Sequence, residues 1–314
     1  MTLLSINGLF SRYSSSKGPV YAVDDVDFEL DSGESLGIAG ESACGKSTLG
    51  LSLIRMLSGG DSSGTILFDG DSILDLSESD FDEKFRWKKI SMIFQGAMNS
   101  LDPVFTIHQQ FVEILKQHNF DGNFTKLILD SINSVNLDED VLKKYPHELS
   151  GGMKQRVTIA MGISLEPKVI LADEPTSALD VVVQRHVMDT LQNAQEKIGA
   201  GLILVGHDMG LMAQFVHRIG VMYAGKLVEI APVKTIFKNP IHPYTKMLIR
   251  SLPKLDSHGR FFGIPGLPPA LLNLSPGCTF CESVEDFSHV GEPVEWTMIS
   301  KDHEVLMCGG CEKR

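Results

Sequence analysis

The stretch that decides the fold is Gly40-Glu41-Ser42-Ala43-Cys44-Gly45-Lys46-Ser47. It fits the pattern G-x-x-x-x-G-K-[ST], in which glycines allow the backbone N–H groups to converge on phosphate oxygens. The apolar run at 34–39 predicts a short strand before it, and the apolar spacing at 46–57 predicts a helix after it. A strand, a glycine-rich loop and a helix in this order predict a phosphate-binding loop at the positive N-terminus of a helix.

The residues of this loop receive separate expected roles. Lys46 is expected to reach the outer phosphates, and Ser47 to bind magnesium. At Cys44 the backbone is expected to matter more than the thiol, because this position of the pattern is variable. The residues expected to contact nucleotide here are Gly40, Ser42, Ala43, Cys44, Gly45, Lys46, Ser47 and Thr48.

Composition points to a folded enzyme that does not act on nucleic acid. The 314 residues are 43% hydrophobic and 22% charged, close to the averages of globular proteins. The formal net charge of -12 argues against binding to a phosphate backbone as the main task. The first ten residues lack the pattern of a signal peptide, and no apolar run is long enough to cross a bilayer, so export is not expected.

The hydrophobic pattern predicts an α/β fold. Further strands are expected at 65–68, 90–94, 169–172 and 202–205, with helical segments between the last three, as in a mostly parallel sheet with crossover helices. The stretch 107–157 is mostly helical in pattern and is predicted to be an inserted subdomain, placed at about 97–157. Val221 to Ile230 is predicted to be a closing hairpin, and the composition changes after Pro232.

The strand predicted at 169–172 ends in Asp173 and Glu174. Open α/β sheets bind their ligands at the carboxyl ends of the strands, so both carboxylates are candidates for nucleotide chemistry. Asp173 is expected to hold magnesium, as the corresponding Asp of other enzymes with this loop does. Glu174 is then the candidate general base that orients and deprotonates the attacking water.

Leu149-Ser150-Gly151-Gly152-Met153-Lys154-Gln155-Arg156 resembles the signature sequence of the ATP-binding cassette family. The resemblance extends over about residues 3 to 235, with the motifs in the family's order. It implies a Q-loop at Gln95, which also contacts magnesium, a D-loop at 177–180 and a switch histidine at His207. It further implies that Tyr13 stacks on adenine and that Gln155 and Asp180 contact nucleotide.

Ser150 is an N-cap candidate, and Gly151 and Gly152 leave the first N–H groups of the next helix uncovered. Such a helix end binds anions, so this is a candidate second phosphate site. The resemblance implies that it contacts the ATP of a neighbouring subunit, because the family pairs head to tail with ATP between the two chains.

The family resemblance also implies the domain organisation. We expect a nucleotide-binding domain at 1–235, with a core that holds the phosphate-binding loop, an N-terminal antiparallel β subdomain and the helical insertion. A C-terminal extension follows at 236–314.

Asn99-Ser100-Leu101-Asp102-Pro103, Asn239-Pro240-Ile241-His242-Pro243-Tyr244-Thr245 and Ser251-Leu252-Pro253 resemble the oligopeptide and dipeptide importer ATPases. That group also includes nickel and oligosaccharide importers, so peptides are the first expected cargo, oligosaccharides the second and nickel the third. The resemblance implies two transmembrane permease subunits, an extracytoplasmic solute-binding protein and a second, related but different ATPase chain. It places the chain at the cytoplasmic face of the inner membrane, as a peripheral subunit.

Four cysteines form two Cys-x-x-Cys pairs near the C-terminus, and the first pair begins in Ser275-Pro276-Gly277-Cys278. Importer ATPases of this group often carry four cysteines that bind an iron–sulfur cluster, which implies a 4Fe-4S cluster here. The close spacing departs from that group's pattern and is equally natural for tetrahedral zinc, so both metals remain open. The candidate ligands are Cys278, Cys281, Cys308 and Cys311.

The alternative function is that of a soluble cassette ATPase in DNA repair or translation. In repair members a long coiled coil separates the phosphate-binding loop from the signature sequence. The sequence between these two motifs here has no sustained heptads. Translation members carry two cassettes, and this chain has one. The sequence therefore favours a transport ATPase that uses ATP and Mg²⁺.

Overall fold

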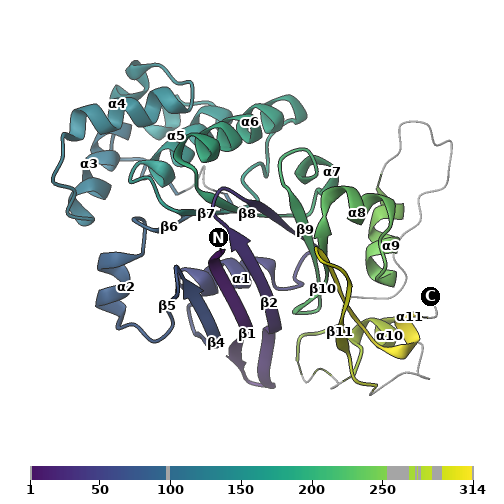
Figure 1. Ribbon diagram of the computed structural model, residues 1–314. Coiled ribbons are helices and arrows are strands. Elements are labelled where there is room, and N and C mark those ends of the chain that lie inside the picture. The colour runs from purple at the N-terminus through teal and green to yellow at the C-terminus, as the bar shows by residue number, and fades with distance from the viewer. Residues whose placement is uncertain are drawn as a thin grey trace. The chain divides into compact units, whose positions relative to one another are not determined.

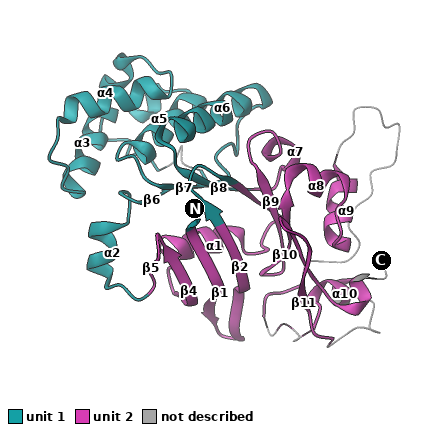
Figure 2. Cartoon of the chain, viewed as in Figure 1, with its two compact units in different colours: residues 1–3, 30–35, 75–205 teal, residues 4–29, 36–74, 206–314 magenta. Residues whose placement is uncertain are grey.

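The computed structural model describes residues 2–96, 100–252, 269–272, 274, 277–284 and 292–312. The chain forms two compact units, coloured separately in Figure 2. Unit 1 comprises residues 1–3, 30–35 and 75–205, and unit 2 comprises residues 4–29, 36–74 and 206–314. The elements are labelled in Figure 1.

Unit 2 contains most of a four-stranded N-terminal sheet. Strand β1 pairs with β4 in antiparallel register, with Leu4 opposite Phe68 and Ile6 opposite Ile66. These apolar side chains are buried, because alternate residues of a strand point to the same face. The order of strands is β2-β1-β4-β5, with bounds β1 Thr2–Ser15, β2 Gly18–Asp31, β4 Gly60–Phe68 and β5 Asp71–Ser72.

Unit 2 also holds a run of strands that supports the phosphate-binding loop. Strand β3 (Ser35–Ala39) is parallel to β9 (Arg218–Tyr223), and β9 is antiparallel to β10 (Lys226–Pro232). The turn at Ala224 and Gly225 has positive φ at both residues, which is typical of tight hairpins, and the predicted hairpin is confirmed.

The C-terminal tail adds two strands that the sequence did not predict. Strand β12 (His303–Met307) pairs with β10 in antiparallel register, with Val305 opposite Glu229. Strand β11 (Glu295–Ser300) pairs with β12 and is mostly exposed. The tail is therefore part of the same run of strands as the hairpin.

The first helix is shorter than predicted. Helix α1 (Lys46–Leu53) ends where Arg55 adopts φ 54°, while the N–H of Met56 donates to the carbonyl of Leu51. This left-handed closure satisfies the last carbonyls and stops the helix, so the expected end at residue 57 was wrong. Among the described residues of unit 2, the other helices are α7 Met209–Met212, α8 Val233–Lys238, α9 Pro243–Ser251, α10 Thr279–Ser283 and α11 Gly309–Glu312.

Unit 1 contains three parallel strands, β6 (Ile90–Ile93), β7 (Val169–Asp173) and β8 (Gly201–Gly206), apart from the last residue of β8. Their residues are buried throughout, as expected for parallel strands covered on both faces. The pattern at 90–94, 169–172 and 202–205 therefore predicted these strands correctly.

The stretch predicted to be helical contains three helices and two short 3₁₀ turns. Thr106 opens α3 with a capping box to Gln109, and Phe111 of α3 and Ile132 of α4 are fully buried. The helical elements of unit 1 are α2 Glu78–Lys84, α3 Ile107–Gln117, α4 Phe124–Ser134, the 3₁₀ turns Glu139–Lys143 and Pro146–Glu148, α5 Gly151–Ile163 and α6 Val181–Ile198. Among the helices described, none has the length and apolarity needed to cross a membrane.

Candidate functional site

The phosphate-binding loop in unit 2 has a shape that requires its glycines. At Gly45 φ is 108°, and a Cβ there would lie 1.9 Å from the carbonyl oxygen of Ala22. A Cβ at Gly40 would lie 2.2 Å from the carbonyl oxygen of Met222. No larger residue fits at either position without moving backbone, so β2 and β9 hold the loop in its wrapped form.

Lys46 lies across this loop. Its side chain is 6% exposed, and Nζ donates hydrogen bonds to the carbonyl oxygens of Gly40 at 2.8 Å and Glu41 at 2.7 Å. Ser42, Ala43 and Ser47 are exposed. The ammonium group is thus fixed beside a loop whose outer residues remain open to a ligand, as phosphate binding requires.

The backbone of Cys44 connects the loop to the turn of the hairpin. Its carbonyl accepts a hydrogen bond from Gly225 N–H at 2.9 Å, and its side chain is buried. Burial raises the pKa of the Cys44 thiol, although the nearby charge of Lys46 opposes this shift. The thiol therefore stays neutral and adds no charge to the phosphate site.

Two further predicted residues lie in unit 2. The hydroxyl of Tyr13 is 3.5 Å from Oγ1 of Thr48, in the first turn of α1, and a Cβ at Gly60 would lie 2.9 Å from the Tyr13 ring. His207 is exposed and directly follows β8, next to Asp208, which caps α7. The placement of Tyr13 beside the loop agrees with a nucleotide contact, but its role remains a prediction.

In unit 1, two loops bring Gln95 and Glu174 together. Gln95 Nε2 donates a hydrogen bond to Glu174 Oε2 at 2.8 Å. Asp173, the last residue of β7, is 4% exposed. Glu174 adopts φ 44°, and its N–H donates to the carbonyl of Val205 at 2.9 Å. A left-handed, non-glycine residue at the end of a buried strand is the kind of strained backbone that clusters at functional sites.

The signature sequence and the D-loop line one cleft in unit 1. Its volume is about 660 Å³, and its lining includes Ser150, Gly151, Gly152 and Asp180. Ser150 Oγ accepts from Met153 N–H and caps α5, so the predicted N-cap is confirmed. Gln155 is 4% exposed and does not contribute to this lining.

Asp180 caps the next helix. Its Oδ1 accepts hydrogen bonds from the N–H groups of Val182 and Val183, at 3.1 and 3.0 Å. Val183 also packs closely on the signature, because a Cβ at Gly152 would lie 2.6 Å from its Cγ1. The glycine is needed for this approach of α6 to α5.

The predicted catalytic residues are distributed over both units. Within unit 2 the structure brings together Tyr13, the phosphate-binding loop and the supporting hairpin. Within unit 1 it brings together Gln95 and Glu174, and separately the signature and D-loop. Asn99, Pro253, Ser275 and Pro276, which belong to the importer-like motifs, lie outside the described residues.

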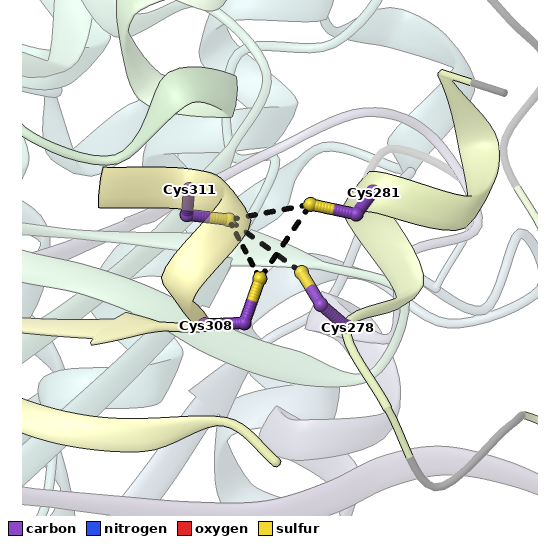
Figure 3. Close-up of side chains that lie close together, drawn as sticks. All are labelled: Cys278, Cys281, Cys308 and Cys311. Carbon is purple, nitrogen blue, oxygen red and sulfur yellow. Dashed lines mark hydrogen bonds between the residues drawn. The ribbon is translucent and has the colours of Figure 1, made fainter. Parts of the chain in front are cut away.

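The four predicted metal ligands of the tail converge, and Figure 3 shows their sulfur atoms pointing toward one another. All four thiols are buried, and their Sγ atoms lie within 4.8 Å of one another. The Sγ atoms of Cys278 and Cys311 are 3.6 Å apart, as are those of Cys281 and Cys308. Cys278 and Cys281 come from the α10 region, and Cys308 and Cys311 from the end of β12 and α11.

The spacing of these sulfurs can be compared with the two candidate metals. Four thiolates at 2.3 Å from one zinc ion form a tetrahedron with edges of about 3.8 Å. The separations of 3.6–3.7 Å between the paired sulfurs match this value. A four-iron cluster holds each thiolate on a different iron, so its ligands would have to move apart. The donor set fits both metals, and the spacing fits a single ion.

The thiols also affect one another's protonation. A hydrogen bond from Cys311 lowers the pKa of Cys278 to about 5, whereas burial raises the pKa of Cys281 to about 12. Burial and the neighbouring thiolate therefore resist a second negative charge. A bound cation would remove this cost, because its charge stabilises thiolates.

Sequence reasoning missed Glu229 and His303, and it singled out His242 and Tyr244 only as part of an importer-like motif. Glu229, in β10, is fully buried, and its carboxylate accepts from the N–H groups of Ile241 and His242 and contacts His303 Nε2 at 2.8 Å. Tyr244 is also fully buried, and its hydroxyl accepts from Glu41 N–H at 3.1 Å. A glutamate inside the apolar run Leu227 to Ala231 was the one signal available for Glu229.

Comparison with known proteins places these sites in a family. Residues 23–177 match the family described as ABC transporter, and residues 228–283 match the family described as oligopeptide/dipeptide transporter, C-terminal region. The dipeptide transport ATP-binding protein DppD of Lactococcus lactis is 40% identical, over 88% of this chain and 82% of its own length. The oligopeptide transport ATP-binding protein OppD of Salmonella typhimurium is 38% identical, over 93% of this chain and 90% of its own.

Solved structures agree with this result. A dimeric ATP-binding cassette in a post-hydrolysis state, bound to ADP and Pi, is similar with a TM-score of 0.64 and 26% identity, over 73% of this chain and 98% of its own. CbiO1 from Clostridium perfringens, part of an ABC transporter complex, is similar with a TM-score of 0.66 and 28% identity, over 76% of this chain and 91% of its own. The relatives support the transport prediction rather than the alternative in repair or translation. The chain belongs to the ATP-binding cassette family of transporter ATPases, in the group of the peptide importers.

Proposed function

We propose that this chain hydrolyses ATP to drive the import of oligopeptides or dipeptides. The main support for peptides as the cargo is the match of residues 228–283 to the oligopeptide/dipeptide transporter C-terminal region. The names of the relatives DppD and OppD give additional support. Glycine-rich and carboxylate motifs would serve any cargo, so the cargo assignment depends on this C-terminal region.

The proposed partners follow from the same group. The chain would work with two transmembrane permeases, an extracytoplasmic solute-binding protein and a second ATPase chain, related but different, as a peripheral subunit at the cytoplasmic face of the inner membrane. The cleft at Ser150, Gly151 and Gly152 supports the pairing of two ATPase chains, because its uncovered helix N-terminus suits the phosphates of an ATP held by the neighbour.

The proposed roles in hydrolysis are assigned residue by residue. Lys46 neutralises the outer phosphates, and Glu174, hydrogen-bonded to Gln95, orients and deprotonates the attacking water. His207 contacts the γ-phosphate and senses its presence. Magnesium, with Ser47, Gln95 and Asp173 as the proposed ligands, would supply charge neutralisation at the phosphates.

The four tail cysteines are proposed to hold a metal. The resemblance to importer ATPases favours a 4Fe-4S cluster, and the sulfur separations favour a single zinc ion. Iron and zinc analysis of protein purified without oxygen, together with its visible absorption spectrum, separates the two. Brown protein with about four irons per chain supports the cluster, colourless protein with one zinc supports the single ion, and metal-free protein contradicts the proposal.

The cargo proposal is tested in the assembled transporter. The complex should be co-purified with its permeases, reconstituted in vesicles and assayed for ATP hydrolysis with its binding protein and a mixture of short peptides. Peptides should stimulate hydrolysis, and a Glu174→Gln complex should show no stimulation. Stimulation by short oligosaccharides or nickel instead of peptides would contradict the assignment.

A further inference from the structure

A tyrosine from the C-terminal extension contacts the phosphate-binding loop. The Tyr244 hydroxyl accepts a hydrogen bond from the N–H of Glu41, the second residue of the loop, at 3.1 Å. Both residues belong to unit 2. Tyr244 is fully buried, and this partly buried hydrogen bond holds the loop next to Gly40.

The same aromatic cluster reaches the loop by a second route. The rings of Tyr244 and Tyr223 are 4.5 Å apart, and Tyr223 directly follows Met222. The carbonyl oxygen of Met222 lies 2.2 Å from the position of a Cβ at Gly40, and its methyl group lies 2.8 Å from the position of a Cβ at Gly45. A shift of Tyr244 and Tyr223 would therefore change the packing around both Gly40 and Gly45.

The other end of the segment 242–244 contacts the four-cysteine centre. His242 Nδ1 accepts a hydrogen bond from Tyr244 N–H at 3.2 Å, so the ring proton of the neutral imidazole lies on Nε2. Nε2 is 3.9 Å from Cys311 Sγ. His242 is 1% exposed, and the N–H groups of residues 241 and 242 are anchored on the buried carboxylate of Glu229. The segment thus lies between the sulfur of Cys311 and the phosphate-binding loop.

Phe280 provides the packing between the two sites. It lies between Cys278 and Cys281 in the sequence, and its side chain is 1% exposed. Its ring packs edge-on against His242 at 5.5 Å and Tyr223 at 5.7 Å between ring centroids. Any constraint on Cys278 and Cys281 therefore fixes the position of Phe280 against the aromatic cluster.

We propose that Tyr244 is a positioning residue for the phosphate-binding loop, and that the four-cysteine centre holds Tyr244 in place through His242 and Phe280. The role of the four-cysteine centre rests on the proposed metal site, whereas the role of Tyr244 in positioning the loop does not. Ligation of the four cysteines then raises the affinity for ATP without any metal contact to the nucleotide. Loss of the metal loosens the loop from a distance.

The first test compares two hydroxyl deletions within the cluster. Tyr244→Phe removes the acceptor of the Glu41 N–H and keeps the ring, while Tyr223→Phe removes a hydroxyl that bonds to Ser283 instead. Tyr244→Phe should raise the Kd for a fluorescent ATP analogue by about 2- to 10-fold, the range expected for one hydrogen bond. Metal content should not change. In the assembled transporter, Tyr244→Phe should raise the KM for ATP and leave kcat unchanged. Tyr223→Phe should have the same Kd, KM and kcat as the wild-type protein. Equal Kd values in all three proteins would overturn the positioning role.

The second test addresses the link to the cysteines. Cys308→Ser should lower metal content and raise the Kd for ATP, and adding Tyr244→Phe should then have no further effect, because both changes act on one contact. Additive effects would overturn the link.

A second variant, His242→Asn, tests the same link if Cys308→Ser folds poorly. It keeps a side-chain acceptor for the Tyr244 N–H but lacks the Nε2–H group beside Cys311. It should release metal to a chelator faster and bind ATP more weakly, and wild-type rates of release would overturn the link. Metal analysis of the wild-type protein separates failure of this link from failure of the metal proposal.

Discussion

The side-chain amide of Gln95 donates a 2.8 Å hydrogen bond to Oε2 of Glu174, although 79 positions separate the two residues in the chain. A carboxylate that accepts such a bond is fixed in orientation. A general base must be aimed at the water it deprotonates, and Gln95 thus prepares Glu174 for its proposed role.

Glu174→Gln tests that role. The variant should keep its affinity for ATP but hydrolyse it at least about 10²-fold more slowly, since the amide cannot take a proton from water. Single-turnover hydrolysis in the assembled transporter measures the rate, and equilibrium nucleotide binding provides the control. Near-normal turnover would refute the assignment of the base.

Lys46→Ala should weaken ATP binding about 10- to 100-fold, because it removes a charge-assisted contact to phosphate and the two bonds that Lys46 makes to the loop. Titration with a fluorescent nucleotide measures the change. Lys17→Ala, at an exposed position in the β1–β2 turn, is the matched control. An unaltered affinity in Lys46→Ala would count against the phosphate-binding loop.

Gly45→Ala should abolish ATP binding, because its Cβ would meet the carbonyl of Ala22 at 1.9 Å and force the loop open. Gly33→Ala is the control for backbone strain alone: its φ is also positive, at 74°, but no atom lies within 4 Å of the new Cβ. That variant should lose about 1 kcal/mol of stability and keep its ATP affinity. Thermal unfolding with and without ATP distinguishes the two, and equal behaviour would show that the close contact is unimportant.

Gly152→Ala should reduce hydrolysis in the assembled transporter by about 10-fold, since a Cβ 2.6 Å from Val183 displaces the signature from its position. Its binding of ATP as an isolated chain should not change. Val183→Ala removes the obstructing methyl group, so the double variant should recover most of the lost activity. Failure of this rescue would mean that the glycine acts in some other way than by close packing.

Local patterns predicted much of the fold. The glycine-rich loop, the apolar strands ending at Ala172 and Val205 and the hairpin at Ala224-Gly225 all lie where their spacing placed them, because each is specified by residues close in sequence. The end of α1 was misplaced, since the left-handed turn at Arg55 comes from a residue type that rarely adopts it.

Contacts between residues far apart in the chain could not be predicted from the sequence. The pair Tyr244 and Glu41, 203 positions apart, has no signature in either local stretch. The strand Glu295–Ser300 is mostly exposed and has no buried face, so its pairing with β12 defines it. The four cysteines could be predicted as candidate metal ligands because two Cys-x-x-Cys pairs in such a chain usually indicate a metal site.

The pairing of β12 with β10 has a consequence for how the tail can be handled experimentally. Strand β10 uses β9 on one side and the tail on the other, so a chain cut after residue 235 would leave the N–H and C=O groups of β10 as an open sheet edge. It would also strip the cover from the carboxylate of Glu229, which is fully buried. A shortened version of this ATPase should therefore self-associate, and solubility would be lost before catalysis could be measured.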